Sequence, residues 1–368
     1  MFKLNIEDQS RIKLAEKLNT SETHLIKGLF GSGISLRIAN QFRTSKKNFL
    51  FTLNDAEQAA YFLNDLEHLS GEENILFFPS SKRKAYSQNN IDNSNVLQRS
   101  SVLKQISDKK QKIIVTYPEA LFEKIISKKT LKKNTLTLKK GMNISLDFIN
   151  ESLFEYGFEK VDFVSSPGDF SVRGGIIDVY SYSNQHPYRI EFFSDTINSL
   201  RTFDVKSQLS ISNIDIIDLI PNTSSILINE ERQSLIDLLP IDSVLITLNV
   251  DKIANTLDIL YKKSEESFGE LNSTVQNPPE RLFLNSVEWI NSLKNNCHLI
   301  LNRSDFLKPD TITRFNQKPQ PTFNKNFDFL VEHFNKNHKN GIVNYILCTN
   351  SKQVKRLNDI FQEMDEVV

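Results

Sequence analysis

The residues best suited to chemistry form a glycine-rich turn near the start of the chain. Gly28 and Gly33 have the spacing of a phosphate-binding loop, G-x-x-x-x-G-K-[ST], and Ser35 stands at its hydroxyl position. In such a loop the lysine supplies positive charge to the nucleotide phosphates and the hydroxyl helps to hold Mg²⁺. Here the lysine position is Ile34, which carries no charge. We therefore expect a degenerate phosphate loop kept as scaffold. Weak anion binding by backbone N–H groups at a helix start is the alternative.

A second candidate set lies in the segment 188–193, which reads YRIEFF. Because side chains alternate along a strand, positions 188, 190 and 192 face one way, while Arg189, Glu191 and Phe193 face the other. The first face suits a core. The second combines an arginine, a carboxylate and an aromatic ring, a set typical of protein–protein interfaces. An ordinary solvated surface with one exposed phenylalanine is the alternative, and alternation by itself does not decide between the two.

No other residues in the sequence have spacing suited to catalysis or metal binding. An ATPase needs a buried strand that ends in an acidic pair, and the candidate pair Asp365-Glu366 follows a predicted helix instead. The six histidines have no metal-ligand spacing, and Cys297 and Cys348 are far apart. We expect no catalytic residues, no metal and no cofactor in this chain.

Composition limits the class of protein. With 368 residues, 39% of them hydrophobic, the chain has room for two or three domains with a sizeable core. Its net charge of zero argues against a protein whose main task is electrostatic binding of DNA. We expect no signal peptide, since the first residues lack its apolar region, and the sequence has no apolar run of roughly 18–20 residues. Its few cysteines fit a reducing compartment. We expect a monomeric cytoplasmic protein that does not contact membranes.

The elements that must position these residues alternate between strand and helix. Short apolar runs predict buried strands, each followed by a helical pattern. The strands are predicted near residues 24–27, 48–53, 74–79, 113–116, 226–228, 244–248 and 298–301, and a helix over 6–20 precedes them. This order is typical of an α/β fold with a parallel, doubly wound sheet. We expect residues 1–126 and 216–310 to be two halves of one such domain.

The alternation is interrupted over residues 127–215. Residues 124–140 hold seven lysines and no acid, which could form a nucleic-acid stripe. Aromatic residues do not interleave with them, so a solvated edge is favoured. A helix over 141–155 and three short strands follow, and we expect an inserted α+β domain. Residues 311–368, which contain the proline boundary at 318–321, are expected to start a further, truncated α/β domain with a strand over 342–347.

Three segments resemble a known family, the N-terminal UvrB-like module of bacterial transcription-repair coupling factor (Mfd). This module is in turn similar to the first part of the excinuclease subunit UvrB. The segments are the turn at 28–35, residues 113–121 (IIVTYPEAL), and residues 167–179 (PGDFSVRGGIIDV) with 188–193 and 199–204. UvrB keeps the lysine of the phosphate loop. Ile34 departs from UvrB and agrees with the coupling-factor module.

The resemblance implies a degenerate P-loop, helicase-like domain with an inserted domain that binds UvrA. By position in the motif, Arg173, Arg189 and Phe193 match residues of the UvrA contact, and Arg201 and Glu191 are weaker matches. The implied function is a non-catalytic module that recruits UvrA, and so nucleotide excision repair, to stalled RNA polymerase. The ATP-driven motor and the contacts with RNA polymerase and DNA belong to domains absent from this chain. An ATP-dependent DNA helicase or excinuclease fragment of the UvrB type is the alternative.

The resemblance also predicts how a variant behaves. We expect Arg189→Ala to weaken UvrA binding strongly while the melting temperature stays nearly unchanged, since interface arginines lie at the surface.

Overall fold

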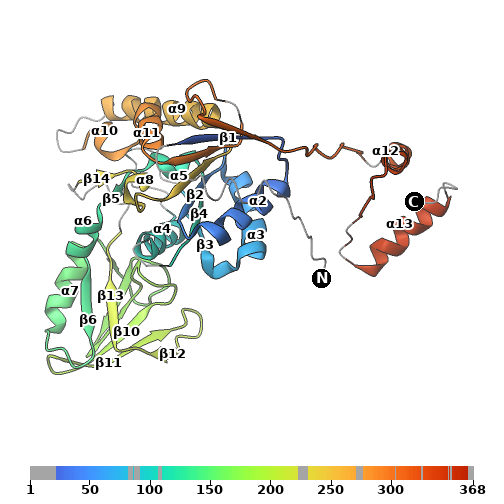
Figure 1. Ribbon diagram of the computed structural model, residues 1–368. Coiled ribbons are helices and arrows are strands. Elements are labelled where there is room, and N and C mark those ends of the chain that lie inside the picture. The colour runs from blue at the N-terminus through green and yellow to red at the C-terminus, as the bar shows by residue number, and fades with distance from the viewer. Residues whose placement is uncertain are drawn as a thin grey trace. The chain divides into compact units, whose positions relative to one another are not determined.

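The computed structural model divides the chain into two compact units, residues 1–317 and 318–368 (Figure 1). The helix expected over 6–20, the strand expected over 226–228 and the acidic pair Asp365-Glu366 lie outside the residues that the structure describes. The described residues are 22–81, 86, 92–106, 110–222, 231–270, 277–302, 304–324, 326–346, 348 and 350–363.

A parallel sheet of seven strands forms the centre of the first unit, in the order β17-β1-β16-β15-β2-β4-β3. Its strands are β1 Thr23–Lys27, β2 Phe49–Thr52, β3 Ile75–Phe77, β4 Ile113–Thr116, β15 Val244–Thr247, β16 Cys297–Ile300 and β17 Thr311–Arg314. Four of them, β2, β4, β15 and β16, are buried at every position, which explains their mainly apolar sequences. The expected α/β, parallel-sheet class is confirmed.

Helices cover both faces of this sheet (Figure 1). On one face lie α2 Ser32–Ser45 and α3 Ala56–Ser70, followed by the short 3₁₀ helix η1 Glu72–Asn74. On the other lie α5 Pro118–Phe122, α9 Val250–Gly269, α10 Pro279–Leu282 and α11 Ser286–Lys294. Side-chain caps fix where several of them begin. Asp55 accepts a hydrogen bond from the Gln58 N–H at the start of α3, and Asn249 accepts one from the Lys252 N–H at the start of α9.

The inserted domain is built on a second sheet, of six strands in the order β12-β11-β10-β9-β8-β7. The strands are β7 Glu159–Lys160, β8 Asp169–Arg173, β9 Ile176–Val179, β10 Tyr188–Phe193, β11 Thr196–Phe203 and β12 Ser210–Asn213. Helix α7, Leu146–Glu155, contributes the buried Ile149 and Leu153 to a core shared with Phe170 and Ile190 of the sheet. The sequence predicted this α+β arrangement with three strands, and the structure has six.

Short paired strands connect the inserted domain to the parallel sheet. β6 Leu136–Lys139 pairs with β13 Ile216–Leu219, and β5 Ile125–Ile126 pairs with β14 Arg232–Gln233. Helix α6, Lys128–Lys133, and the short helix α8, Leu235–Leu238, lie beside these ribbons in the chain. Residue 216, where we expected the second half of the sheet domain to begin, is thus paired with β6. Likewise β17, expected in the last domain, is an edge strand of the parallel sheet.

One helix belongs to the cores of both domains. Helix α4, Asn93–Gln105, places Val96 in the core of the inserted domain and Leu103 in the core of the sheet domain. Between them, the guanidinium of Arg99 is fully buried and donates to the carbonyls of Pro79 (2.8 Å) and Ala120 (3.1 Å). Burial lowers the pKa of Arg99. These bonds attach α4 firmly to the sheet domain, and α4 in turn supports the inserted domain.

The second unit contains two helices, α12 Phe327–Lys339 and α13 Ser351–Glu363. A small cluster of Val331, Phe334 and Phe361 holds them together. The unit begins at Lys318, where the proline-rich sequence predicted a boundary. The strand expected over 342–347 is wrong, because residues 342–346 have no strand structure and their side chains at 342, 343 and 345 are exposed.

A buried histidine in the parallel sheet predicts a pH dependence of stability. His298 of β16 is fully buried, with its Nε2 atom 2.7 Å from the Thr247 hydroxyl, and burial lowers its pKa to about 3. The unfolded chain takes up a proton there near pH ~6.5, and the folded chain does not. The free energy of unfolding is therefore expected to fall by about 1.4 kcal/mol per pH unit as the pH drops from ~6 towards 4.

Urea unfolding of wild type and His298→Gln across this pH range measures that contribution. The free energy of unfolding should change more steeply with pH in the wild type, by the equivalent of one bound proton. The variant keeps every other titrating group. Equal slopes would contradict the assignment.

Candidate functional site

The candidate face of the inserted sheet is arranged as alternation predicts. Tyr188 and Ile190 are buried in the core beneath it. Arg189, Glu191 and Phe193 lie on the opposite face, and the ring of Phe193 is 78% exposed at the end of β10. A large apolar ring with so much exposed surface contributes little to the stability of the fold and is available to a binding partner.

A buried carboxylate lies at the centre of this face. Asp178 of β9 is 1% exposed and stands directly opposite Arg189 of β10. Its Oδ1 atom accepts from Arg189 Nε at 2.7 Å and its Oδ2 atom accepts from Arg189 Nη2 at 2.8 Å. Arg173 of β8 donates to the same Oδ2 through Nη2. The hydrogen bond with Asp178 raises the pKa of Arg189, so the guanidinium stays charged.

A second carboxylate separates two arginines that would otherwise repel each other. Arg189 and Arg201 are direct cross-strand neighbours on β10 and β11, a like-charge pairing that destabilises a sheet. Arg201 donates through Nη2 to the Oε2 atom of Glu191 at 2.9 Å. The same Oε2 atom also accepts from the Ser199 hydroxyl at 2.8 Å. The face therefore carries alternating charges, with each arginine held by an acid.

The five candidate residues differ in how far a partner could reach them. Arg189 is 17% exposed, and besides Asp178 it bonds the Gln208 carbonyl and lies 4.5 Å from the Phe203 ring centre. Arg173 is 42% exposed, and its guanidinium rests over the ring of Phe163. Glu191 and Arg201 are 38% and 30% exposed, so Phe193 is the most accessible of the five and Arg189 the least. The prediction that Arg189→Ala leaves the melting temperature unchanged is corrected, because Arg189 neutralises a buried carboxylate.

Sequence reasoning missed two residues of this face. Asp178 sits in the apolar run IIDV, where a lone carboxylate on a buried strand signals a charged partner across the sheet. Phe163 lies in the loop after β7, is 65% exposed, and stands beside Arg173 at 5.3 Å. No periodic pattern marks Phe163, because loops have none.

The glycine-rich turn is filled by the chain itself. Gln317, after β17, accepts through Oε1 from the Phe30 N–H at 2.8 Å, and its own N–H donates to the Gly28 carbonyl at 3.3 Å. A Cβ atom at Gly33 would lie only 2.4 Å from that Oε1. Gly28 has a φ of +76°, which favours glycine at this position. A neutral carboxamide thus bonds a backbone N–H of this turn.

The other two positions of the turn point into the fold. Ile34 is part of the hydrophobic core of the sheet domain. The Ser35 hydroxyl is fully buried, and within the described part of the chain it has no hydrogen-bond partner. Neither side chain faces a ligand site: Ile34 packs in the core and the Ser35 hydroxyl is enclosed.

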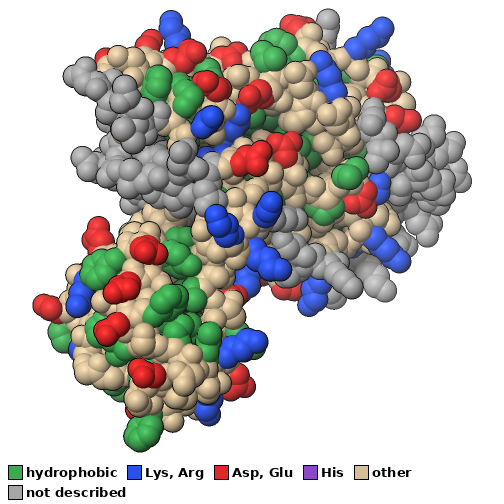
Figure 2. All heavy atoms as spheres, turned by 90° about the vertical axis from the view of Figure 1, so that its left-hand side faces the viewer, with side chains coloured by type: hydrophobic (Ala, Val, Ile, Leu, Met, Phe, Trp, Pro, Cys, Tyr) green, Lys and Arg blue, Asp and Glu red, His purple; other side chains and the backbone are tan. Residues whose placement is uncertain are grey.

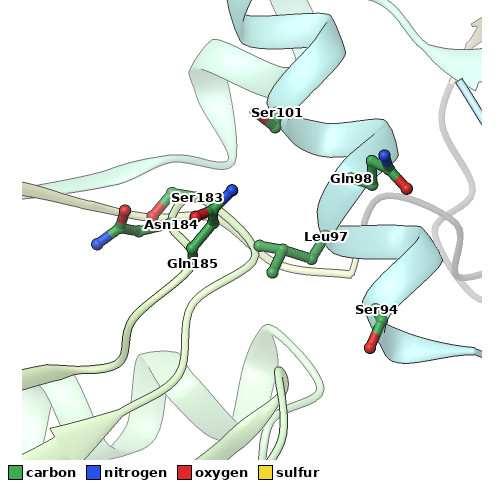
Figure 3. A pocket seen from close by; sticks show the side chains of 7 residues that line it. All are labelled: Ser94, Leu97, Gln98, Ser101, Ser183, Asn184 and Gln185. Carbon is green, nitrogen blue, oxygen red and sulfur yellow. The ribbon is translucent and has the colours of Figure 1, made fainter. Parts of the chain in front are cut away.

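The remaining surfaces offer less chemistry. A cavity of about 450 Å³ lies between α4 and residues 183–185, lined by three serines, three amides and Leu97 (Figure 3). It has no titratable lining group.

Basic side chains cluster on the molecular surface (Figure 2). Helix α6 exposes Lys129, Lys132 and Lys133, while Lys124 is paired with Glu288 at 2.8 Å. Within the described ranges, no group of three His, Cys, Asp or Glu side chains is arranged for a metal, and no helix is long and apolar enough to cross a membrane.

These features define a class: a helicase-like parallel-sheet domain with an inserted α+β domain. Residues 136–224 match the UvrB interaction domain family. The chain is 31% identical over 211 residues to the transcription-repair-coupling factor of Bacillus subtilis (strain 168), covering 56% of this chain and 18% of that protein. It is 32% identical over 123 residues to that of Escherichia coli (strain K12), covering 33% and 11%. The resemblance to the coupling-factor module is confirmed, and the chain spans less than a fifth of these relatives.

Proposed function

We propose that this chain is a non-catalytic binding module that recruits UvrA. As part of a transcription-repair coupling factor, it would bring excision repair to stalled RNA polymerase. It would act as a monomer in the cytoplasm, with RNA polymerase and DNA bound by other domains. The observation that carries the proposal is the exposed Phe193 beside the paired arginines, inside the segment that matches the UvrB interaction domain.

The geometry suits a docking surface with one apolar anchor. Phe193 projects from a rigid sheet and can fill a pocket on the partner, where a buried aromatic ring contributes most of the affinity. Arg173 keeps part of its guanidinium in solvent, available to a carboxylate on UvrA. The face holds three arginines (173, 189, 201) and two acids (178, 191), a balance of +1. Shape and the anchor, more than net charge, would therefore determine the partner.

Direct binding of purified UvrA to the purified chain tests the proposal. Immobilised chain should capture UvrA with a saturable isotherm, and excess free chain should compete. Absence of binding at micromolar concentrations of both proteins, with the chain folded by circular dichroism, would rule the proposal out.

The rival function, an ATP-dependent helicase or excinuclease fragment, makes an opposite prediction at the turn. We expect ATP with Mg²⁺ to give no binding heat in calorimetry up to about 1 mM, since Ile34 supplies no charge and Gln317 already bonds the Phe30 N–H. The matched variant Gln317→Ala should not bind either, because it still lacks the lysine. Micromolar binding by wild type would support the rival.

A further inference from the structure

We infer that Asp178 is a positioning residue, which orients Arg173 and Arg189 together before the partner arrives. The inference rests on the proposed function and adds to it the residue through which the docking face is preorganised. Asp178 itself is too deeply buried to touch a partner.

The position of Asp178 makes this role specific. Its strand, β9, lies between β8, which carries Arg173, and β10, which carries Arg189. The two carboxylate oxygens are shared: Oδ1 takes the Nε of Arg189, and Oδ2 takes an Nη2 from each arginine. A single rigid group thereby fixes both guanidinium groups in neighbouring places on the sheet.

Charge is essential to this arrangement. Arg189 stands directly opposite Arg201, and Arg201 is held away by Glu191. Without the negative charge of Asp178, Arg189 would lose its bidentate partner and its charge opposite Arg201 would be uncompensated. The other contacts of Arg189, the Gln208 carbonyl and the Phe203 ring, carry no net charge. Both Arg173 and Arg189 would then sample several rotamers.

Rotamer freedom in the free protein weakens binding. A long side chain that is disordered before association must be immobilised in the complex, and this lowers the affinity for each ordered side chain. For two arginines together the expected loss is about tenfold in Kd. The carboxamide of an Asp178→Asn variant preserves the size of the side chain while removing its charge.

Nuclear magnetic resonance of the arginine side chains tests positioning without UvrA. In wild type the Nε–Hε groups of Arg189 and Arg173 should be ordered on the nanosecond timescale, and Asp178→Asn should make both mobile while the backbone spectrum of the sheet is retained. The signal of Arg99, buried on α4, is the internal control and should not change. Ordered Arg173 and Arg189 signals in the variant would overturn the inference even if UvrA binds.

Affinity for purified UvrA provides the second readout. Asp178→Asn should bind about tenfold more weakly than wild type. Combining it with Arg173→Ala should weaken binding by much less than the product of the single effects, because both changes remove the same ordered arginine. Combining Asp178→Asn with Phe193→Ala should weaken binding by the product of the two single effects. Wild-type affinity of Asp178→Asn, or full multiplication with Arg173→Ala, would contradict positioning. Absence of UvrA binding by wild type would refute the proposed function instead.

A variant that removes both buried charges covers the case in which Asp178→Asn fails to fold. In Asp178→Asn/Arg189→Gln, the remaining Arg173 should lose its order and affinity should still fall. An ordered Arg173 in this double variant would equally overturn the inference.

Discussion

Arg189→Ala is expected to lower the free energy of unfolding by about 3 kcal/mol. The substitution leaves the buried carboxylate of Asp178 with Arg173 as its remaining cationic partner, and it removes the cation from the face of the Phe203 ring. Breaking a buried ion pair from one side is strongly destabilising because a charge stays buried without full compensation. We place the effect at the low end of the usual range since Arg173 still bonds Asp178.

The matched control is Arg201→Ala on the neighbouring strand. Both members of this pair are partly solvated, so the pair contributes little, and the expected loss is below about 1 kcal/mol. Urea unfolding of the three proteins at neutral pH gives both values. Equal stability of Arg189→Ala and wild type would mean that Asp178 is solvated or paired in another way. Any loss of UvrA binding by Arg189→Ala must therefore be corrected for its unfolded fraction.

Phe193→Ala is expected to weaken UvrA binding by about thirtyfold or more, equivalent to ~2 kcal/mol, without changing the melting temperature. The ring is 78% exposed, so its removal creates no cavity in the fold. This variant separates recognition from stability more cleanly than Arg189→Ala does.

Phe306→Ala serves as the control for loss of an exposed phenylalanine. Phe306 is 56% exposed and follows β16 in the parallel-sheet domain, outside the segment 136–224. It should bind UvrA as wild type does. If Phe193→Ala retained full affinity in the same assay, the anchor would have to be another residue, with Phe163 the first to examine.

The sequence was informative where one strand or helix decides the outcome. The runs of β2, β4, β15 and β16 predict a parallel sheet because they are mainly apolar, and every position in them is buried. Alternation in 188–193 places Phe193 and Arg189 on one face, and the structure has them there. Both inferences need only the geometry of a single strand. The role of the five candidate residues in binding UvrA remains a prediction.

Contacts between residues far apart in the sequence could not be predicted from the pattern of a single strand. The motif RGGIIDV contains Asp178, yet its arginine partners become visible only when β8, β9 and β10 are in register. The same limit explains residues 216 and 311, since the sequences of β13 and β17 do not show which strand each one pairs with. It explains 342–346 too, which have the composition of a strand but no neighbouring strand within the described part of the second unit.

The Gln317 contact was equally invisible, because Phe30 and Gln317 are 287 residues apart. The sequence of this turn resembles a nucleotide site, but in the fold the turn is bonded by Gln317. The loss of the lysine at position 34 is visible in the sequence, whereas the carboxamide that bonds the turn is not.

That contact also bears on how the protein folds as it is synthesised. β1 is the first described strand of the chain, yet its two neighbours in the sheet, β16 and β17, are the last two described strands of the first unit. A ribosome delivers the chain from its N-terminus, and contacts between segments so far apart in sequence form late. β1 must therefore wait, unpaired, until β16 and β17 have left the ribosome. The parallel sheet can start from β2, β4 and β3, and the insertion of β1 between β16 and β17 is the final step, completed when Gln317 bonds the turn.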